Sequence, residues 1–269
     1  MGGRKTEGGE VTDINRRKFL KLAGASTIVG LLGGWKAVEL LAPGELEAKY
    51  LPKPEALTAK RWAMAVDIKK MDEDTAKKCI EVCHRIHNVP DIGDPRREIK
   101  WIWLEPFKNA FPGQHQEHIA ERLKEEPFIV LCNHCDNPPC VRVCPTKATW
   151  KREDGIVMMD QHRCIGCRFC MAACPFGSRS FNWGDPRPFI KKRYPEYPTR
   201  EKGVVEKCNF CAERLAKGLM PGCVEASDGA LVFGDLADPK SEVRRVFRQH
   251  FAIKRKPHLG TNPQVYYIV

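Results

Sequence analysis

The fold of this chain is decided by residues 164–175, which read Cys164-Ile-Gly-Cys167-Arg-Phe-Cys170-Met-Ala-Ala-Cys174-Pro175. Two residues separate each of the first three cysteines, three separate the third from the fourth, and a proline follows. Three thiolates so spaced can wrap a tight loop around one [4Fe-4S] cluster, while the fourth lies a helical turn away and reaches a second cluster. The proline cannot continue a helix and turns the chain outward.

A second unbroken run lies upstream, with the spacing C-x2-C-x4-C-x3-C followed by proline: Cys132, Cys135, Cys140, Cys144 and Pro145. Structural zinc is the first alternative, because zinc sites also use paired C-x2-C units. Zinc does not need three cysteines within seven residues followed by a fourth and a proline. Disulfides are the second alternative, but cysteines this close in sequence are poor partners for one another. The two runs therefore predict iron–sulfur clusters.

The five remaining cysteines form two incomplete runs: Cys208, Cys211 and Cys223 downstream, and Cys79 and Cys83 upstream. In the downstream run a fourth ligand three residues on would fall at position 227, which is a serine. The upstream run keeps only the last two positions of a ferredoxin run, because there is no cysteine between Met71 and Lys78.

The four runs together resemble the four-cluster ferredoxin-type subunits of membrane oxidoreductases, the family of the NrfC and polysulfide-reductase electron-transfer subunits. In that family the runs cross-pair, first with fourth and second with third. The resemblance implies three complete ligand sets: Cys132, Cys135, Cys140 and Cys174 for cluster 1; Cys164, Cys167, Cys170 and Cys144 for cluster 2; Cys208, Cys211, Cys223 and Cys83 for cluster 3. A fourth cluster would need position 227 and three ligands near residues 71–79, where only Cys79 remains.

We therefore expect three [4Fe-4S] clusters, with these twelve cysteines binding iron and no other metal. Ser227 as an oxygen ligand stays an open alternative, and Cys79 has no assigned role. A missing cluster in the middle of the relay would interrupt electron transfer. We therefore expect the position of the missing fourth cluster to lie at one end of the relay.

An α+β fold follows from the resemblance, built of two ferredoxin-like modules, one inserted in the other, and rich in loops. The expected divisions are a signal segment over 1–48 and an electron-transfer domain over 49–269, with an inner module at 125–185, an outer module at 61–124 and 186–235, and a C-terminal extension at 236–269. Residue patterns predict strands over 61–67, 101–105, 128–131, 179–183, 204–206, 230–233 and 265–268, a hairpin over 148–159, and helices over 74–87 and 241–250. The 20 prolines and 21 glycines indicate many turns.

The N-terminus reads as a twin-arginine export signal, Asn15-Arg16-Arg17-Lys18-Phe19. The uncharged stretch that follows, residues 22–35, is shorter than the roughly 20 residues that a spanning helix needs. Cleavage after Ala48 is one expectation and an uncleaved anchor the alternative. Because this route exports proteins already folded around their cofactors, we expect the chain on the outer, periplasmic face of the cytoplasmic membrane.

The formal net charge of +11 is strongly basic. Twelve thiolates around three cluster cores of about +2 contribute about −6, so part of the excess compensates buried anions. Basic runs remain at 191–193, 244–248 and 254–256, which suit a solvated face, lipid head groups or an acidic partner. No nucleic-acid-binding signature accompanies them, and nucleic acid is not expected. No dinucleotide fingerprint, P-loop or acid–base pair is evident, so no catalytic residue is expected.

Within the family, residues 79–90, Cys-Ile-Glu-Val-Cys-His-Arg-Ile-His-Asn-Val-Pro, most resemble the DsrO (HmeA) type of subunit found in DsrMKJOP and Hdr-like menaquinol-oxidising complexes. The resemblance implies an NrfD-type quinone-interacting membrane subunit, a multihaem cytochrome c, and cytochrome b and disulfide-reductase-like subunits as partners in sulfur-based anaerobic respiration. The expected function is single-electron relay. The alternatives are the same relay in a polysulfide or nitrite reductase complex, and a non-redox scaffold stabilised by metal.

Three further groups of residues have an ordinary interpretation. The C-x3-C-H sequence at 79–84 has one residue too many for haem attachment. His134 is expected to hydrogen-bond to backbone, and Trp101, Trp103 and Trp183 are expected to pack around clusters.

Overall fold

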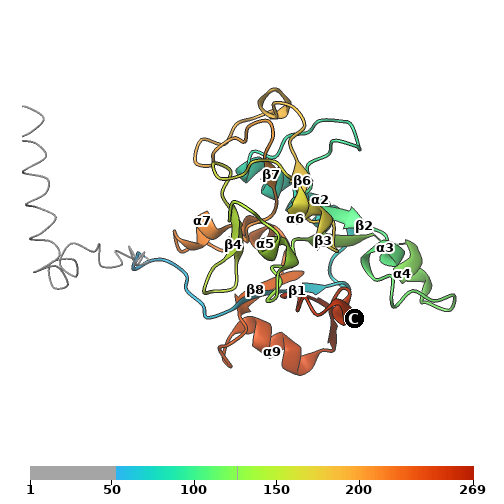
Figure 1. Ribbon diagram of the computed structural model, residues 1–269. Coiled ribbons are helices and arrows are strands. Elements are labelled where there is room, and N and C mark those ends of the chain that lie inside the picture. Colours follow the sequence, from blue (N-terminus) through green and yellow to red (C-terminus); the bar gives the residue numbers. More distant parts are fainter. Residues whose placement is uncertain (1–52, 126) are drawn as a thin grey trace, which may run out of the picture. The chain divides into compact units, whose positions relative to one another are not determined.

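A four-stranded sheet joins the two ends of the chain that the computed structural model describes, residues 53–125 and 127–269. The strand order is β8 (Leu231–Asp235), β1 (Trp62–Asp67), β10 (Val265–Ile268) and β9 (Ala252–Ile253). Strand β1 runs parallel to β10, with Met64 opposite Val265, and antiparallel to β8 (Figure 1). The expected twin-arginine signal lies outside the described residues.

The two faces of β1 pack against different partners, because alternate side chains of a strand point to opposite faces. Trp62, Met64 and Val66 enter the main apolar core. Ala63 and Ala65 face the other way and pack against the helix α9 (Glu242–Gln249). The expected helix at 241–250 and strand at 265–268 are therefore confirmed. Residues 236–269 are more than an extension, since they supply the strand that lies between β1 and β9.

Three antiparallel two-stranded sheets lie next to the cysteine runs at 132–144, 164–174 and 208–223. They are β2 (Ile102–Glu105) with β3 (Phe128–Leu131), β4 (Thr149–Lys151) with β5 (Val157–Met159), and β6 (Ser180–Phe181) with β7 (Val205–Glu206). The β2–β3 connection contains α3 (Phe107–Ala110) and α4 (Glu121–Glu125), and single 3-10 turns lie at Arg187–Phe189 and Pro257–Leu259. Each predicted strand has a counterpart in the structure, with shorter bounds at 179–183.

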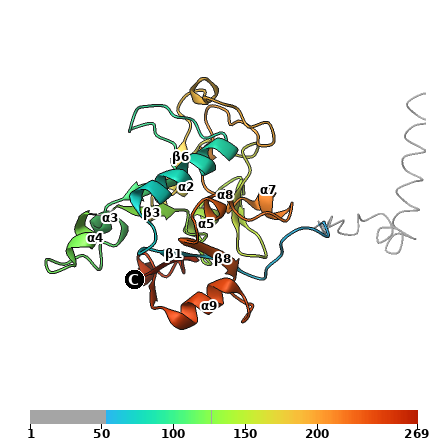
Figure 2. The same cartoon turned by 180° about the vertical axis from the view of Figure 1, so that it is seen from behind.

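The long helix α2 (Glu73–Ile86) carries the upstream cysteines. Its N-terminus is capped by Asp72, whose carboxylate accepts a hydrogen bond from the Thr75 backbone N–H at 2.7 Å. The helix packs against α8 (Gly222–Glu225), and the two lie side by side (Figure 2). A Cβ at Gly222 would lie only 2.7 Å from Ile86 Cδ1, so glycine permits this close approach.

Three other four-residue helices lie beside cysteines: α5 (Pro139–Arg142), α6 (Phe169–Ala172) and α7 (Ala212–Leu215). Four residues form little more than one turn, which is too short for an apolar period to be read from sequence. The result is a mixed α+β, loop-rich fold, as expected. None of the helices in the described ranges is long and apolar enough to cross a membrane.

Candidate metal centres

Three cysteine loops share one unusual backbone feature. The residue immediately before the second cysteine has a positive φ in each: 40° at His134, 71° at Gly166 and 54° at Phe210. Positive φ is uncommon for residues other than glycine. Its recurrence at one position of three C-x2-C loops shows that the chain wraps the same way three times. Cys79 and Cys83, by contrast, lie one turn apart on α2.

The first set of cysteines faces a single small cavity. Its lining includes Cys132, Cys135, Cys140 and Cys174, which we call site 1. Burial, together with the charges of the other three thiolates, raises the pKa of the Cys135 thiol to about 12. Four convergent sulfur atoms that disfavour one another's ionisation suit a cationic iron core, which would neutralise them.

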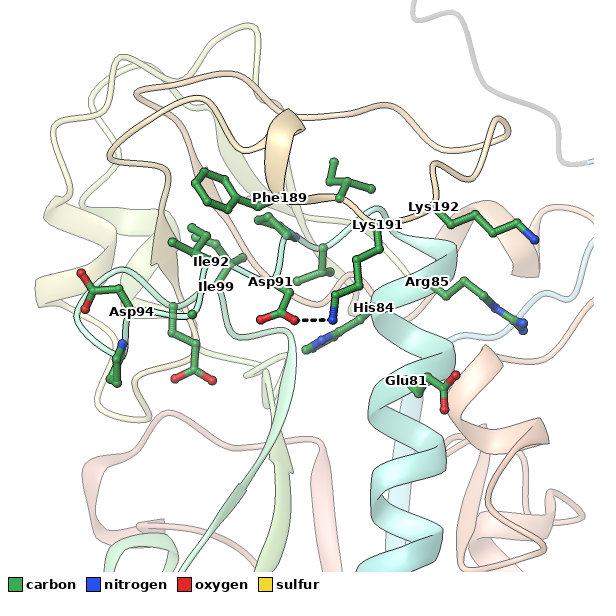
Figure 3. Close-up of a pocket in the computed structure, with 16 residues that line it drawn as sticks. Glu81, His84, Arg85, Asp91, Ile92, Asp94, Ile99, Phe189, Lys191 and Lys192 are labelled. Carbon is green, nitrogen blue, oxygen red and sulfur yellow. Dashed lines mark hydrogen bonds and ion pairs between the residues drawn. The ribbon is translucent and has the colours of Figure 1, made fainter.

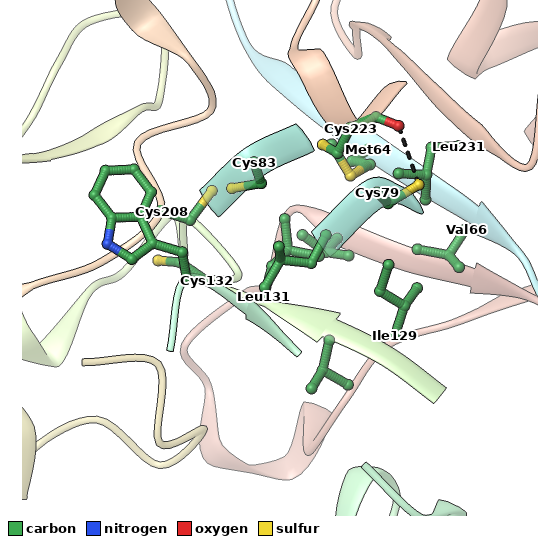
Figure 4. Close-up of a cluster of buried hydrophobic side chains, with 14 of the residues drawn as sticks. Met64, Val66, Cys79, Cys83, Ile129, Leu131, Cys132, Cys208, Cys223 and Leu231 are labelled. Atoms are coloured by element: carbon green, nitrogen blue, oxygen red, sulfur yellow. Dashed lines mark hydrogen bonds between the residues drawn. The ribbon is translucent and has the colours of Figure 1, made fainter. Parts of the chain in front are cut away.

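The third set, site 3, is the most enclosed. Cys83, Cys208, Cys211 and Cys223 are all buried. Burial raises the pKa of Cys83 well above its ordinary value, and the thiolates of the other three add to the rise. Cys83 on α2 therefore lies beside a loop more than 120 residues downstream (Figure 4). Four convergent thiols that disfavour one another's ionisation suit a cationic iron core here, as at site 1.

The second set, site 2, consists of Cys164, Cys167, Cys170 and Cys144. Burial raises the pKa of Cys170, and the charges of Cys140 and Cys164 contribute. Cys144 follows α5, which packs against α6. Burial alone would raise the pKa of Cys144, but hydrogen bonds from the backbone at Thr149 and from Thr146 leave it lowered, which favours the thiolate. Cys167 is exposed, whereas Cys144 and Cys164 are half-buried.

Each site adjoins the next through particular thiols, and we call this order the row of sites. Cys140 of site 1 is close enough to Cys170 of site 2 for its charge to raise that thiol's pKa. Cys132 of site 1 acts in the same way on Cys208 of site 3 (Figure 4). Beyond site 3 lies Cys79, whose charge acts on Cys223. The sequence is therefore site 2, site 1, site 3 and then Cys79.

Beyond site 3, both candidate residues of a fourth site are engaged in protein hydrogen bonds. The Cys79 thiol donates to the Cys223 carbonyl oxygen at 3.3 Å, and burial raises the pKa of Cys79 to about 11. The Ser227 hydroxyl donates to the Val224 carbonyl oxygen at 2.8 Å and accepts from the Leu231 N–H at 3.0 Å. Both side chains are fully buried. Cys79 thus joins α2 to α8, a role that the sequence did not indicate.

Two buried cations lie among the sites and were not identified from the sequence. Arg179 donates from Nη2 to Thr149 Oγ1 at 2.8 Å. Burial alone would lower the pKa of Arg179, but the charges of Cys140, Cys170 and Cys132 raise it, so this guanidinium stands between sites 1 and 2. Lys207 donates from Nζ to the Cys208 carbonyl oxygen at 2.6 Å. Both residues are close in sequence to cysteine runs, which was the available signal.

A buried polar network surrounds site 3. His87 Nδ1 lies 2.9 Å from the Cys83 carbonyl oxygen, and Nε2 lies 2.8 Å from Glu213 Oε1. Burial alone would raise the pKa of Glu213, but the hydrogen bond with His87 and that residue's charge leave it lowered. The His87 ring stacks on Trp101, with centroids 4.5 Å apart. Trp101 Nε1 donates to Glu206 Oε2 at 2.7 Å.

The expectations for two other residues have different outcomes. His134 accepts a hydrogen bond from the Val157 backbone N–H at 3.0 Å, as expected of a backbone-bonded histidine. Trp183 was expected to pack around a cluster, but it is 47% exposed. The Arg168 guanidinium lies 4.7 Å from its ring centroid, so Trp183 belongs to the surface near site 2.

A larger groove of about 700 Å³ lies along α2, away from the thiols (Figure 3). Its lining includes His84, Ile99 and Phe189, and no cysteine. Asp91 and Lys191, 2.8 Å apart, form an ion pair across it. The groove therefore differs in chemistry from the three sites.

Comparison with known proteins gives concordant matches. A 4Fe-4S dicluster domain model matches residues 126–187. The chain is 39% identical to the Hdr-like menaquinol oxidoreductase iron-sulfur subunit 1 of Archaeoglobus fulgidus, over 94% of this chain and 97% of that protein. It is 34% identical to the iron-sulfur cluster-binding subunit of menaquinone reductase from Nitratidesulfovibrio vulgaris, over 77% and 88% of the two chains. It is 36% identical to the NrfC homologue of Haemophilus influenzae, over 88% and 92%.

Proposed function

Because this chain belongs to the NrfC and polysulfide-reductase-type family of [4Fe-4S] electron-transfer subunits, we propose that it relays single electrons through three clusters in a membrane-associated respiratory complex. Each cluster, when bound, accepts and releases one electron. The protein holds the clusters in a row, shields them and sets the charge around them. The observation that carries the proposal is the set of three equivalent C-x2-C loops, with four convergent thiols at site 1 and four at site 3.

The count of three clusters is supported by the arrangement beyond site 3. Cys79 and Ser227 are used to join protein elements, and they follow site 3 at the end of the row. A vacancy at an end leaves the relay continuous from site 2 through site 1 to site 3. Sites 1 and 2 share the 132–144 and 164–174 runs, while site 3 combines the outer two, which supports one ferredoxin-like module inserted in another.

The partners and compartment are part of the proposal. We infer an NrfD-type membrane subunit that exchanges electrons with quinone, and a multihaem cytochrome c at the other end of the relay. The similarity to a subunit of a menaquinol oxidoreductase supports the quinone link. Residues 15–21 support export by the twin-arginine route to the outer face of the cytoplasmic membrane.

The decisive experiment compares two cysteines on one helix. The purified full-length holoprotein should contain about twelve iron and twelve sulfide per chain. Cys79→Ala should leave both values and the electron paramagnetic resonance (EPR) spectrum of the reduced protein unchanged. Cys83→Ala should lose or convert one cluster while the other two remain. About sixteen iron atoms per chain, or equal losses in both variants, would contradict three clusters.

The same samples separate the relay from a metal-stabilised scaffold. A scaffold would contain zinc and give no EPR signal after reduction with dithionite. Purification of the native complex from membranes should recover a quinone-interacting subunit and a cytochrome c. Recovery with a polysulfide or nitrite reductase catalytic subunit instead would keep the relay but reassign the complex.

A further inference from the structure

Site 2 is the one of the three sites whose ligand loop reaches the surface of the described chain. Cys167 is exposed, whereas the four cysteines of site 3 are all buried and three of the four in site 1 are buried. A cluster at site 2 would therefore lie close to anything that contacts the loop 164–170. This position also ends the row of sites.

The side chains two residues before and two residues after Cys167 are apolar and exposed. Ile165 is 67% exposed and Phe169 is 60% exposed, and Trp183 lies nearby through its contact with Arg168. Solvent-exposed loop positions tolerate polar residues well, so two large apolar side chains flanking an exposed ligand suggest that a partner covers them. We call Ile165, Cys167, Phe169 and Trp183 the site 2 rim.

The segments that carry the site 2 cysteines are rich in positive charge. Four exposed cations lie within three residues of a site 2 cysteine in the sequence: Arg142, Lys147, Arg163 and Arg168. Two carboxylates offset them: Asp160, which is partly buried and lies 3.3 Å from Arg163, and the exposed Asp185, which lies two residues from Trp183 and 3.8 Å from Arg187. The rim therefore combines an apolar centre with a cationic border, and it differs from the α2 groove, where Lys191 is paired with Asp91.

We propose that the site 2 rim docks a small redox protein whose cofactor edge is surrounded by apolar residues and a border of carboxylates. The inference rests on the proposed relay and identifies which end of it meets a soluble partner. An apolar centre excludes water where the two proteins touch. Opposite charges on the two borders orient the partner and raise the rate of association.

The test uses an acidic c-type cytochrome as the probe and the full-length holoprotein, both oxidised so that no electron is transferred. Binding is measured by isothermal titration calorimetry at low and at high ionic strength. Ile165→Glu and Phe169→Glu should each weaken binding about tenfold or more, since a carboxylate then faces the carboxylate border. Raising the ionic strength should weaken wild-type binding.

Matched controls are Phe251→Glu, at a position 74% exposed on the α9–β9 connection, and Arg244→Glu on α9. Phe251→Glu changes the charge by one unit, as the rim variants do, and Arg244→Glu changes it by two; neither should alter binding. A basic c-type cytochrome of similar size should bind more weakly than the acidic one. EPR spectra of the reduced rim variants must match the wild type, which shows that site 2 is still loaded.

The proposal is overturned if the acidic cytochrome does not bind, if the rim variants bind like the wild type, or if the α9 variants weaken binding equally. Such results would leave the relay itself untouched as long as the three clusters are present. Loss of the EPR signals in the wild-type protein would instead contradict the proposed function.

Discussion

Single buried charges set the electrostatic environment of the sites. Arg179 stands between sites 1 and 2, and three thiolates from these sites raise its pKa. Its charge is held in place by Thr149, at a position with only 4% exposure. Buried cations of this kind help to explain why a chain with a formal charge of +11 can surround anionic clusters.

Replacing Arg179 with glutamine should lower the reduction potentials of the two adjacent clusters. A unit charge at a separation of about 6 Å is worth about 3 kcal/mol at an effective dielectric constant of about 20, which for one electron is on the order of 100 mV. EPR-monitored redox titration measures the shift. Arg179→Lys keeps the charge and should shift the potentials much less, and an equal shift in both variants would exclude the charge as the cause.

Glu213 gives a prediction for pH. Its pKa is lowered from the ordinary value of 4.5, so its stabilising effect is fully present above pH 4.5 and is lost as the pH falls through the lowered value. Glu213→Gln should therefore lower the apparent melting temperature by about 3–6 °C at pH 7. The difference between the variant and the wild type should shrink as the pH falls below about 4. A difference that grows on acidification would contradict this assignment.

At the scale of elements, the ligand loops depend on backbone shapes that few residues adopt. Gly166 has φ of 71°, and a Cβ there would lie 2.4 Å from the Gly203 carbonyl oxygen. Gly177 has a similar φ of 65° but open space around it. Alanine substitutions at Gly166 and Gly177 therefore distinguish the free-energy cost of the left-handed backbone from the cost of steric crowding.

Gly166→Ala should disrupt site 2, because the loop must move away from Gly203 before it can hold a cluster. We expect about four iron atoms fewer per chain, with sites 1 and 3 retained. Gly177→Ala should keep all three clusters and cost only about 1 kcal/mol for its left-handed backbone. Iron analysis and EPR decide between these outcomes. Full iron content in Gly166→Ala would show that the loop tolerates the displacement.

Elements with a clear periodicity were predictable, and those without one were not. Helices α2 and α9 begin and end within one residue of the predicted bounds, and β3 and β10 match theirs. The helices α5 to α8 are too short for a period, and the parallel pairing of β1 with β10 joins segments that share no local signal. Arg179 and Lys207 lie close to cysteine runs in the sequence, but only the fold reveals that they are buried.

At the scale of the whole molecule, the buried apolar residues described form three clusters, of which two contain cysteines: the main core and a small cluster of Cys140, Val157, Cys170 and Val205. The main apolar core includes cysteines of both outer and inner runs, such as Cys83, Cys132 and Cys208. The small core between α9 and the sheet contains Ala63, Ala65, Val243 and Ile268 and no cysteine. The stability of the main core therefore depends on bound metal far more than the stability of the small core between α9 and the sheet.

Removal of iron by a chelator should unfold the two parts unequally. Amide hydrogens of the hairpins β4–β5 and β6–β7 should lose protection from exchange by about 100-fold or more, because the loops around them lose their clusters. Amides of β1, β8 and β10 should retain more of it. Hydrogen exchange read by mass spectrometry measures both regions in one sample. Uniform loss across the chain would show a single cooperative unit.

The parallel pairing of β1 with β10 has a consequence for biosynthesis. Strand β1 is translated before any of the cluster loops, yet its neighbour β10 comes from residues 265–268, after all of them. A nascent chain can close its cysteine loops one after another, but it completes its sheet only once β10 has left the ribosome. A stop codon placed between α9 and β10 would therefore leave β1 with an open edge, and such truncated products should be degraded.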